Sequence, residues 1–233
     1  MSRINFSCMI EFWFSRTLSY VMEDNLYKAD ELKDLNIKPK INDISLAVLQ
    51  DYYQMFLMPF VYTYYVAVGD DVREFRLRFD SDKFCHLLGI ESIARYHVKQ
   101  KDLSNYRGSN GWNNISQGNI DFKHLKSLNK SKFQSVKAKF VYFYLIPGLL
   151  EEPLAVMFDG NKVNPPVSIE SEMLFYSTYD NAVIHLGIDA DDEGIYFPRT
   201  FFVEKLGSVN VEDIYTVNQT KIEVVKERRT ILV

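Results

Sequence analysis

The sequence is poor in the residues that build metal sites and disulfide frameworks. Its 233 residues include only two cysteines, Cys8 and Cys85, and four histidines. Two cysteines at this separation fit no metal-ligand spacing and cannot form a disulfide framework, so we expect a reducing, cytoplasmic compartment. The sequence also has no P-loop, no GxSxG nucleophile motif, no HExxH zinc motif and no dinucleotide fingerprint. No cofactor and no bound metal are therefore predicted.

Long apolar runs are also missing. Residues 52–69 carry no charge, but Pro59 and five tyrosines in this stretch disfavour a membrane span. A helix end that runs into a buried strand explains the stretch better. Residues 10–14 are too few for the core of a secretory signal, and Arg16 follows closely. We expect no association with a membrane.

The composition is that of an ordinary globular protein, with 47% hydrophobic, 15% aromatic and 25% charged residues. The length fits one large domain, or one domain with an N-terminal extension. The many tyrosines and phenylalanines favour a β-rich or mixed fold, because aromatic side chains pack well on pleated sheets. We divide the chain into an N-terminal arm and helix (1–58), a central α+β domain (59–206) and a C-terminal tail (207–233) that can add a strand.

Local patterns predict helices and strands in a definite order. Apolar spacing and capping residues predict helices at 46–56, at 84–88 with Gly89 at the end, from about 121, and at 131–143. Alternating patterns and turn signals predict a hairpin of 61–68 with 75–79, then strands at 154–158, 173–178, 182–188 and 201–204. Residues 105–118, rich in Gly, Asn and Ser, are expected to form an exposed loop. This order indicates an α+β fold with helices packed on a mainly antiparallel sheet.

The net charge of −4 hides an uneven distribution. Residues 93–150 contain ten Lys and Arg but only Asp102 and Asp121 as acids, so this segment carries +8 and the rest of the chain −12. Such a basic segment suits a polyanion, since each neutralised phosphate releases counterions. A solvated, lysine-rich helix face is the alternative. The candidate phosphate-binding side chains are Lys123, Lys126, Lys130, Lys132 and Lys137.

An acidic segment, 189–194, matches the first half of a calcium-binding loop. The position that should hold a bidentate glutamate is Thr200, and the flanking segments read as strands instead of helices. We therefore interpret it as an acidic turn.

Two short segments resemble each other across a hundred residues. Residues 85–90 (CHLLGI) and 184–188 (IHLGI) each place a histidine beside an apolar run that includes a glycine. The first is expected on a helix and the second on a strand. The second leads into 196–202 (YFPRTFF), which adds an arginine and a hydroxyl group.

The order of these pieces, with a basic helix carrying Lys139 between the two histidine segments, resembles a known family. It is similar to the fourth phage-associated nuclease family of the barnase–EndoU–colicin–RelE superfamily, over roughly residues 60–205. The resemblance implies two helices followed by an antiparallel sheet. It also implies metal-independent RNA cleavage in conflicts among phages, mobile elements and hosts, with an inhibitor or antitoxin protein as a partner.

Carried over by position, the resemblance implies a catalytic set of His86, Lys139, His185, Arg199 and Thr200. One histidine would take the proton of the 2′-hydroxyl and the other would protonate the leaving 5′-oxygen. Lys139 and Arg199 would stabilise phosphate charge, and Thr200 would hydrogen-bond a phosphate oxygen. Lys139 stands where related families often have an arginine, and lysine lacks the bidentate fork of the guanidinium group.

Each residue also has a structural interpretation. His86 can be a core histidine on an apolar helix, and His185 can point to either face of its strand. Arg199 can form a surface salt bridge, and Lys139 can be one more solvated lysine. The leading hypothesis is a toxin-like endoribonuclease acting on RNA, with transfer RNA as one candidate substrate. The alternatives are a catalytically inactive RNA-binding or protein-interaction module, and a protein whose acidic surface inhibits a basic partner.

Overall fold

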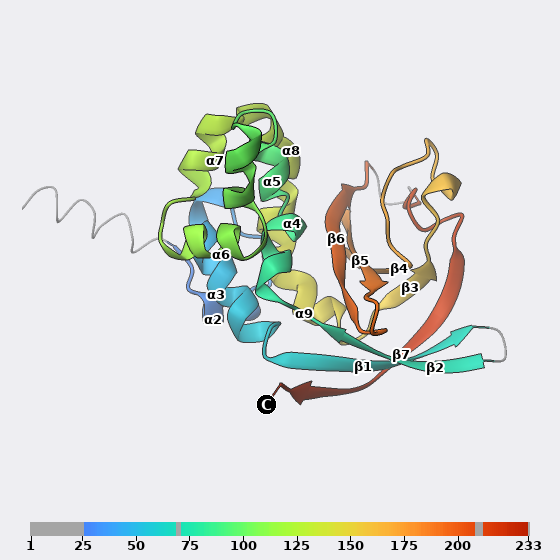
Figure 1. Cartoon of the computed structure of the whole chain (residues 1–233). Helices are drawn as coiled ribbons and strands as arrows, with labels where there is room; N and C mark the ends of the chain where they lie inside the picture. Colours follow the sequence, from blue (N-terminus) through green and yellow to red (C-terminus); the bar gives the residue numbers. More distant parts are fainter. Residues whose placement is uncertain (1–25, 69–70, 208–211, 233) are drawn as a thin grey trace, which may run out of the picture.

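The computed structural model describes residues 26–68, 71–207 and 212–232, in which a helical lobe packs against one side of a β-barrel (Figure 1). The predicted N-terminal arm thus lies largely outside the described residues, as does Cys8. The helices are α2 (Ala29–Lys33), α3 (Leu46–Phe56), α4 (Phe84–Leu87), α5 (Ile90–Ala94), α6 (Gly108–Ser116), α7 (Phe122–Leu128), α8 (Lys130–Tyr142) and α9 (Ile146–Leu149). No helix in the described ranges has the length and apolar character needed to cross a membrane.

The barrel is built from seven strands. They are β1 (Phe60–Val68), β2 (Asp71–Arg78), β3 (Leu154–Met157), β4 (Met173–Tyr179), β5 (Ala182–Ala190), β6 (Tyr196–Lys205) and β7 (Thr220–Ile231). The predicted hairpin is confirmed as β1 and β2, and the four later strands are confirmed as β3 to β6. The two histidine segments lie on different structures, as expected: His86 on helix α4 and His185 on strand β5.

The predicted α+β fold is confirmed, but the mainly antiparallel sheet is not an open one: its strands close into a barrel in the order β1-β2-β6-β5-β4-β3-β7. Strand β7, from the C-terminal segment, pairs antiparallel with both β1 and β3. On the other side β2 meets β6 in a parallel contact at one residue pair, Leu77 with Tyr196. Closure leaves no long open edge on this sheet. It depends on pairings between distant segments that local sequence patterns do not encode.

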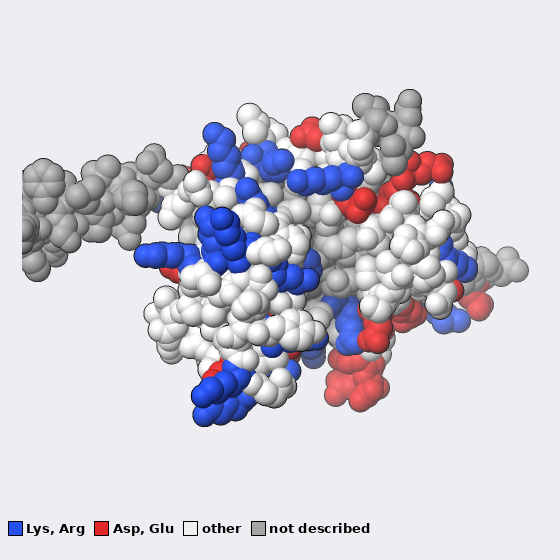
Figure 2. Space-filling model, turned by 90° about the horizontal axis from the view of Figure 1, so that it is seen from above, with Lys and Arg blue, Asp and Glu red and all other residues white. Residues whose placement is uncertain are grey.

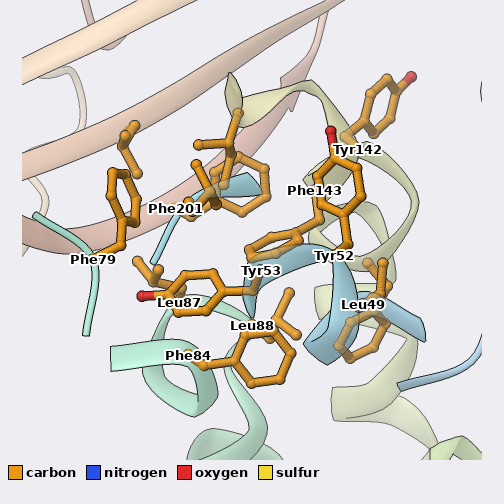
Figure 3. Close-up of a cluster of buried hydrophobic side chains, with 14 of the residues drawn as sticks. Leu49, Tyr52, Tyr53, Phe79, Phe84, Leu87, Leu88, Tyr142, Phe143 and Phe201 are labelled. Carbon is orange, nitrogen blue, oxygen red and sulfur yellow. The ribbon is translucent and has the colours of Figure 1, made fainter. Parts of the chain in front are cut away.

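An aromatic cluster joins the helical lobe to the barrel, with Tyr53 of α3 near its centre (Figure 3). The Tyr53 ring packs against Phe79, Phe84 and Phe143, with centroid distances of 5.9, 5.2 and 6.1 Å. Phe143 then meets Phe201 of β6 edge to face at 5.7 Å. The Tyr53 hydroxyl donates to the Asp80 carbonyl oxygen at 2.9 Å, which satisfies the polar end of a fully buried side chain. This cluster fixes α4 and β6 relative to each other.

The segment predicted as an exposed loop, 105–118, is mainly helical, and this correction matters for the site. Helix α6 packs Trp112 against Tyr53 and Phe84, while Ile115 is buried. Gly111 makes the close approach possible, because a Cβ there would stand 2.7 Å from Cys85 Sγ and 2.9 Å from the Tyr106 carbonyl carbon. Glycine in this helix therefore serves packing, although the composition is typical of a loop.

We expect Gly111→Ala to lower the free energy of unfolding by about 1–3 kcal/mol, because the added methyl overlaps Cys85 and the backbone of Tyr106. Urea unfolding followed by circular dichroism measures the change. Gly148→Ala is the matched control, since its Cβ would meet no atom within 4 Å and alanine favours a helix. Equal stability of the two variants would contradict the packing argument.

Candidate functional site

A cleft of about 580 Å³ opens where the helical lobe meets the first half of β6. Its walls come from segments far apart in sequence: the turn before α4, the start of α6, and the β6 sequence Phe197-Pro198-Arg199. The lining residues are Asp82, Lys83, His86, Glu91, Ser104, Arg107, Gly108, Ser109, Asn110, Phe197, Pro198 and Arg199. Viewed from above, the molecule is hollowed between the two lobes, with Lys and Arg gathered mostly on the helical lobe (Figure 2).

His86 stands on α4 at the wall of this cleft and is solvent-accessible. The apolar residues of the helix, Phe84, Cys85 and Leu87, face the core, so His86 takes the remaining, outward side. Neighbouring residues partly shield the imidazole from water, which lowers the pKa of His86, and the positive charge of Lys139 lowers it further. Glu91 raises the pKa, and Arg199 acts both ways: its charge lowers the pKa and its backbone hydrogen bond raises it. His86 is therefore held mainly neutral near pH 7, as a proton acceptor must be.

Lys139 lies behind His86 and does not itself line the cleft. Its ammonium group donates a hydrogen bond of 3.2 Å to the carbonyl oxygen of Leu87, at the end of α4. Burial, assisted by the charge of Lys132, lowers the pKa of Lys139 to about 8. A charge held in this way costs stability, and groups so perturbed are common at functional sites.

Arg199 reaches the cleft from a β-bulge. Gly187 of β5 pairs with Thr200, and the next residue, Ile188, pairs with Pro198, so Arg199 is the additional residue. Its backbone is thus free to meet His86 instead of continuing the β5–β6 ladder. The guanidinium group bonds Glu170 at 2.7 Å, but Glu170 is 77% exposed. Because an exposed ion pair contributes little, a phosphate can replace this carboxylate at small cost.

Thr200 is next to Arg199 but belongs to the other face of β6. Its methyl group would stand 2.6 Å from a Cβ on Gly187, whereas Phe201 faces the helical lobe and contacts Phe143. The structure thus brings His86 and Arg199 together, with Lys139 behind them, and does not bring Thr200 to the cleft.

His185 is also placed away from His86. It shares with Thr200 the face of the barrel that the segment 212–219 covers, and it is fully buried. Its Nε2 lies 2.7 Å from the Asp213 carboxylate, and its ring stacks on Phe202 at 4.4 Å. Although burial favours the neutral acid, the hydrogen bond and charge of His185 hold the pKa of Asp213 below its usual value. Asp213 also accepts from Thr216 Oγ1 at 2.7 Å, so this cluster fastens the segment to the barrel.

The lysines expected to bind phosphate are spread over two helices. Lys137 lines a second groove, described below, and Lys132 is close enough to Lys139 to lower its pKa. Lys123, Lys126 and Lys130 are exposed on α7 and at the start of α8, and they line none of the described clefts.

The structure adds cleft residues that the sequence did not single out: Lys83, Glu91, Arg107 and Phe197. The Lys83 ammonium stands 4.6 Å from the centre of the Phe197 ring, and Arg107 lies 3.6 Å from Glu91. Arg107 lies in the segment 105–118, for which the sequence predicts an exposed loop and therefore no place at a site. The available signal was the three-residue spacing of Trp112 and Ile115, which is typical of a helix.

The cleft therefore combines a neutral imidazole with three cationic side chains, Lys83, Arg107 and Arg199, each of which is paired with a carboxylate: Asp82, Glu91 and Glu170. Cations of this kind bind phosphate oxygens, and a neutral imidazole accepts a proton. Within the described ranges, no group of three or more His, Cys, Asp or Glu side chains is arranged to hold a metal ion.

Comparison with known proteins agrees with this chemistry. Residues 47–230 match the model of a family described as phage-Barnase-EndoU-ColicinE5/D-RelE like nuclease4. The match includes α3 and β7, which lie outside the 60–205 segment that carried the resemblance. We found no match among curated proteins and none among solved structures.

The buried ammonium of Lys139 gives a pH-dependent stability that can be measured. Because the pKa of Lys139 is lowered from 10.5 to about 8, the unfolded chain binds a proton that the folded chain lacks between these values. The free energy of unfolding of the wild type should therefore rise between pH 7 and pH 10, relative to Lys139→Met, by up to about 2.5 kcal/mol. Urea unfolding at both pH values gives the difference. Lys126→Met, on the exposed face of α7, should follow the wild type; the same behaviour for Lys139→Met would refute the lowered pKa.

Proposed function

This chain belongs to the phage-Barnase-EndoU-ColicinE5/D-RelE like nuclease4 family, and we propose that it is an endoribonuclease whose reaction takes place in the cleft at His86 and Arg199. The observation that carries the proposal is the meeting of these two side chains, from a helix and from a strand of different lobes, in one cleft rich in cations. Such a cleft suits a phosphodiester, and an imidazole beside it suits proton transfer.

The proposed reaction uses the 2′-hydroxyl of RNA as the nucleophile. Neutral His86 takes the proton of this hydroxyl, and the 2′-oxygen forms a bond to the adjacent phosphorus. The bond from phosphorus to the 5′-oxygen breaks, and that oxygen takes a proton from water. The products carry a 2′,3′-cyclic phosphate and a 5′-hydroxyl. No metal ion is needed in this scheme, and DNA, which has no 2′-hydroxyl, is not a substrate.

The cations of the cleft stabilise the charge that develops on the phosphate. Arg199 exchanges its exposed partner Glu170 for phosphate oxygens, and Arg107 and Lys83 add positive charge from the opposite wall. Phe197, which lines the same cleft, offers a ring face on which a base can stack.

Lys139 is a positioning residue in this proposal. It holds the end of α4 through the Leu87 carbonyl, and its charge keeps the pKa of His86 low. The predicted assignment of a second histidine, His185, as the acid finds no support in its buried position beside Asp213. Thr200, which packs on Gly187, is likewise proposed to shape the bulge and not to touch substrate.

The family description, which includes phages, supports a proposal for the biological setting. We propose a toxin-like enzyme that acts in conflicts involving phages or mobile elements and is restrained by an inhibitor protein. Transfer RNA is a compact, abundant substrate for a first test.

A second candidate is a module that binds RNA without cleaving it. Two observations favour it: only one imidazole reaches the cleft, and Arg199 is paired with Glu170. Product analysis separates the two candidates.

Replacing His86 by alanine should reduce RNA cleavage about 10²–10⁴-fold, because the proton acceptor is lost. Cleavage of total RNA and transfer RNA is measured in excess EDTA, and the ends are analysed for cyclic phosphate. His97→Ala, an exposed histidine outside the cleft, is the matched control and should cleave normally.

His185→Gln distinguishes a structural from a chemical role for the second histidine. We expect a lower melting temperature, because the ring that stacks on Phe202 and can carry a positive charge opposite Asp213 is lost, but a cleavage rate close to that of the wild type where the variant is folded. Absence of cleavage by the wild type, with or without magnesium, would leave the binding module as the better explanation.

Lys139→Met should shift the pH dependence of cleavage. Without the nearby ammonium charge the pKa of His86 rises, so the acidic limb of kcat/KM against pH moves to higher pH. A merely structural role of Lys139 would lower the rate equally at every pH. Lys126→Met again serves as the control.

A further inference from the structure

A second groove, of about 850 Å³, lies between α8, the segment 38–42 and the end of β6. It is assembled from three distant parts of the chain, so its composition cannot be recognised in any one stretch of sequence. Four lysines line it: Lys38, Lys40, Lys137 and Lys205. The remaining lining residues include Asn42, Gln134 and Ser135, which can form hydrogen bonds, and a single acid, Glu204.

We call this groove the lysine groove, and its lysines are not neutralised by any residue that the structure describes. Among the described residues, none of the four forms an ion pair. Lys38 instead lies over the ring of Tyr142, with its ammonium 5.2 Å from the centroid. Four cations around one concavity repel each other, and this repulsion favours the binding of an anion.

A third hollow also contains clustered cations, but these are paired with carboxylates. It lies on the barrel, between β1, β2 and β7, and Arg76, Arg78 and Arg228 line it. Each of these arginines pairs with a carboxylate: Arg76 with Glu74, Arg78 with Asp80, and Arg228 with Glu227. The absence of such partners therefore distinguishes the lysine groove from an ordinary charged surface.

The lysine groove is connected to the reaction cleft by strand β6. Phe197, Pro198 and Arg199 line the cleft, and Val203, Glu204 and Lys205 line the groove. At about 3.3 Å per residue, Arg199 and Val203 are roughly 13 Å apart along the strand. Both sites lie between the helical lobe and β6, since α4 and α8 each contact this strand. Along β6, Phe201 lies between the two sites and is buried against Phe143, so an extended polyanion that occupies both passes around this contact.

We propose that the lysine groove binds backbone phosphates of the same RNA strand, on one side of the scissile phosphate, and so makes the enzyme prefer long single-stranded RNA over short fragments. This inference rests on the proposed function for the position of the scissile phosphate. A flexible strand fits better than an acidic protein, because the groove is a concavity with four separated point charges and amide and hydroxyl groups between them.

The test measures binding and cleavage separately. Binding is followed by fluorescence anisotropy in the His86→Ala background, with a labelled single-stranded RNA of a few nucleotides and one several times longer. The groove variant combines Lys38→Gln, Lys40→Gln, Lys137→Gln and Lys205→Gln. A matched control removes the same charge from exposed lysines outside the described clefts, at Lys28, Lys99, Lys101 and Lys162.

We expect the groove variant to bind the long RNA more weakly, with the slope of log K against log salt reduced by about 3. Its affinity for the short RNA should match that of the control. When the four groove substitutions are made in a protein that keeps His86, kcat/KM should fall for the long RNA and stay constant for the short RNA. Melting temperatures show whether both variants fold as the wild type does.

The outcomes separate this proposal from the proposed function. If the groove variant and the control lose the same amount of affinity for the long RNA, the proposal for the groove is wrong, and the proposed endoribonuclease activity is unaffected. If only the groove variant binds the long RNA more weakly and the wild type cleaves no RNA, the groove binds RNA but the protein is not an endoribonuclease. Polyglutamate that competes as well as RNA of equal charge would indicate an acidic protein partner and overturn the proposal.

Discussion

The arrangement of the cleft depends on the aromatic contact between the helical lobe and strand β6. Tyr53 lies against Phe84, next to His86 on α4, and against Phe143, which in turn packs on Phe201, two residues from Arg199. One chain of rings thus sets the distance between the imidazole and the guanidinium group. Because such rings are large and fit only a few relative orientations, a small shift of Tyr53 would move both sides of the cleft.

The bulge at Arg199 has a second effect on the same strand. It frees the backbone of Arg199 for His86, and it lets Thr200 resume pairing opposite Gly187. A side chain at Gly187 would collide with Ser171 Oγ as well as with Thr200. The glycine of the second histidine segment, which looked like part of a chemical motif, is therefore explained by packing around the bulge.

The sequence predicted what local chemistry determines. Strand alternation predicts the β1–β2 pairing, the apolar spacing and Gly89 predict the helix α4, and the sequence motifs single out His86, Lys139 and Arg199. Three features were not readable. The face of His185 depends on the segment 212–219 that covers it, barrel closure depends on β7, and the lysine groove joins Lys38 to Lys205. Each is a contact between distant segments, which periodicity does not specify.

The two histidine clusters differ in how their charged and polar groups are paired. His185 is the more deeply buried. Its Nε2 pairs with Asp213, which also accepts from Thr216, while its Nδ1 has no partner among the described residues, so the cluster holds the segment 212–219 through Asp213. On the His86 side of the molecule, Lys139 keeps a charge at the expense of a lowered pKa, and the lysines of the groove repel one another with no carboxylate partner among the described residues. Folding alone gives no reason to maintain these costs. In our proposal a bound polyanion offsets the repulsion among the groove lysines, because phosphates supply negative charge beside them, and this is why we assign the chemistry to the His86 side of the molecule.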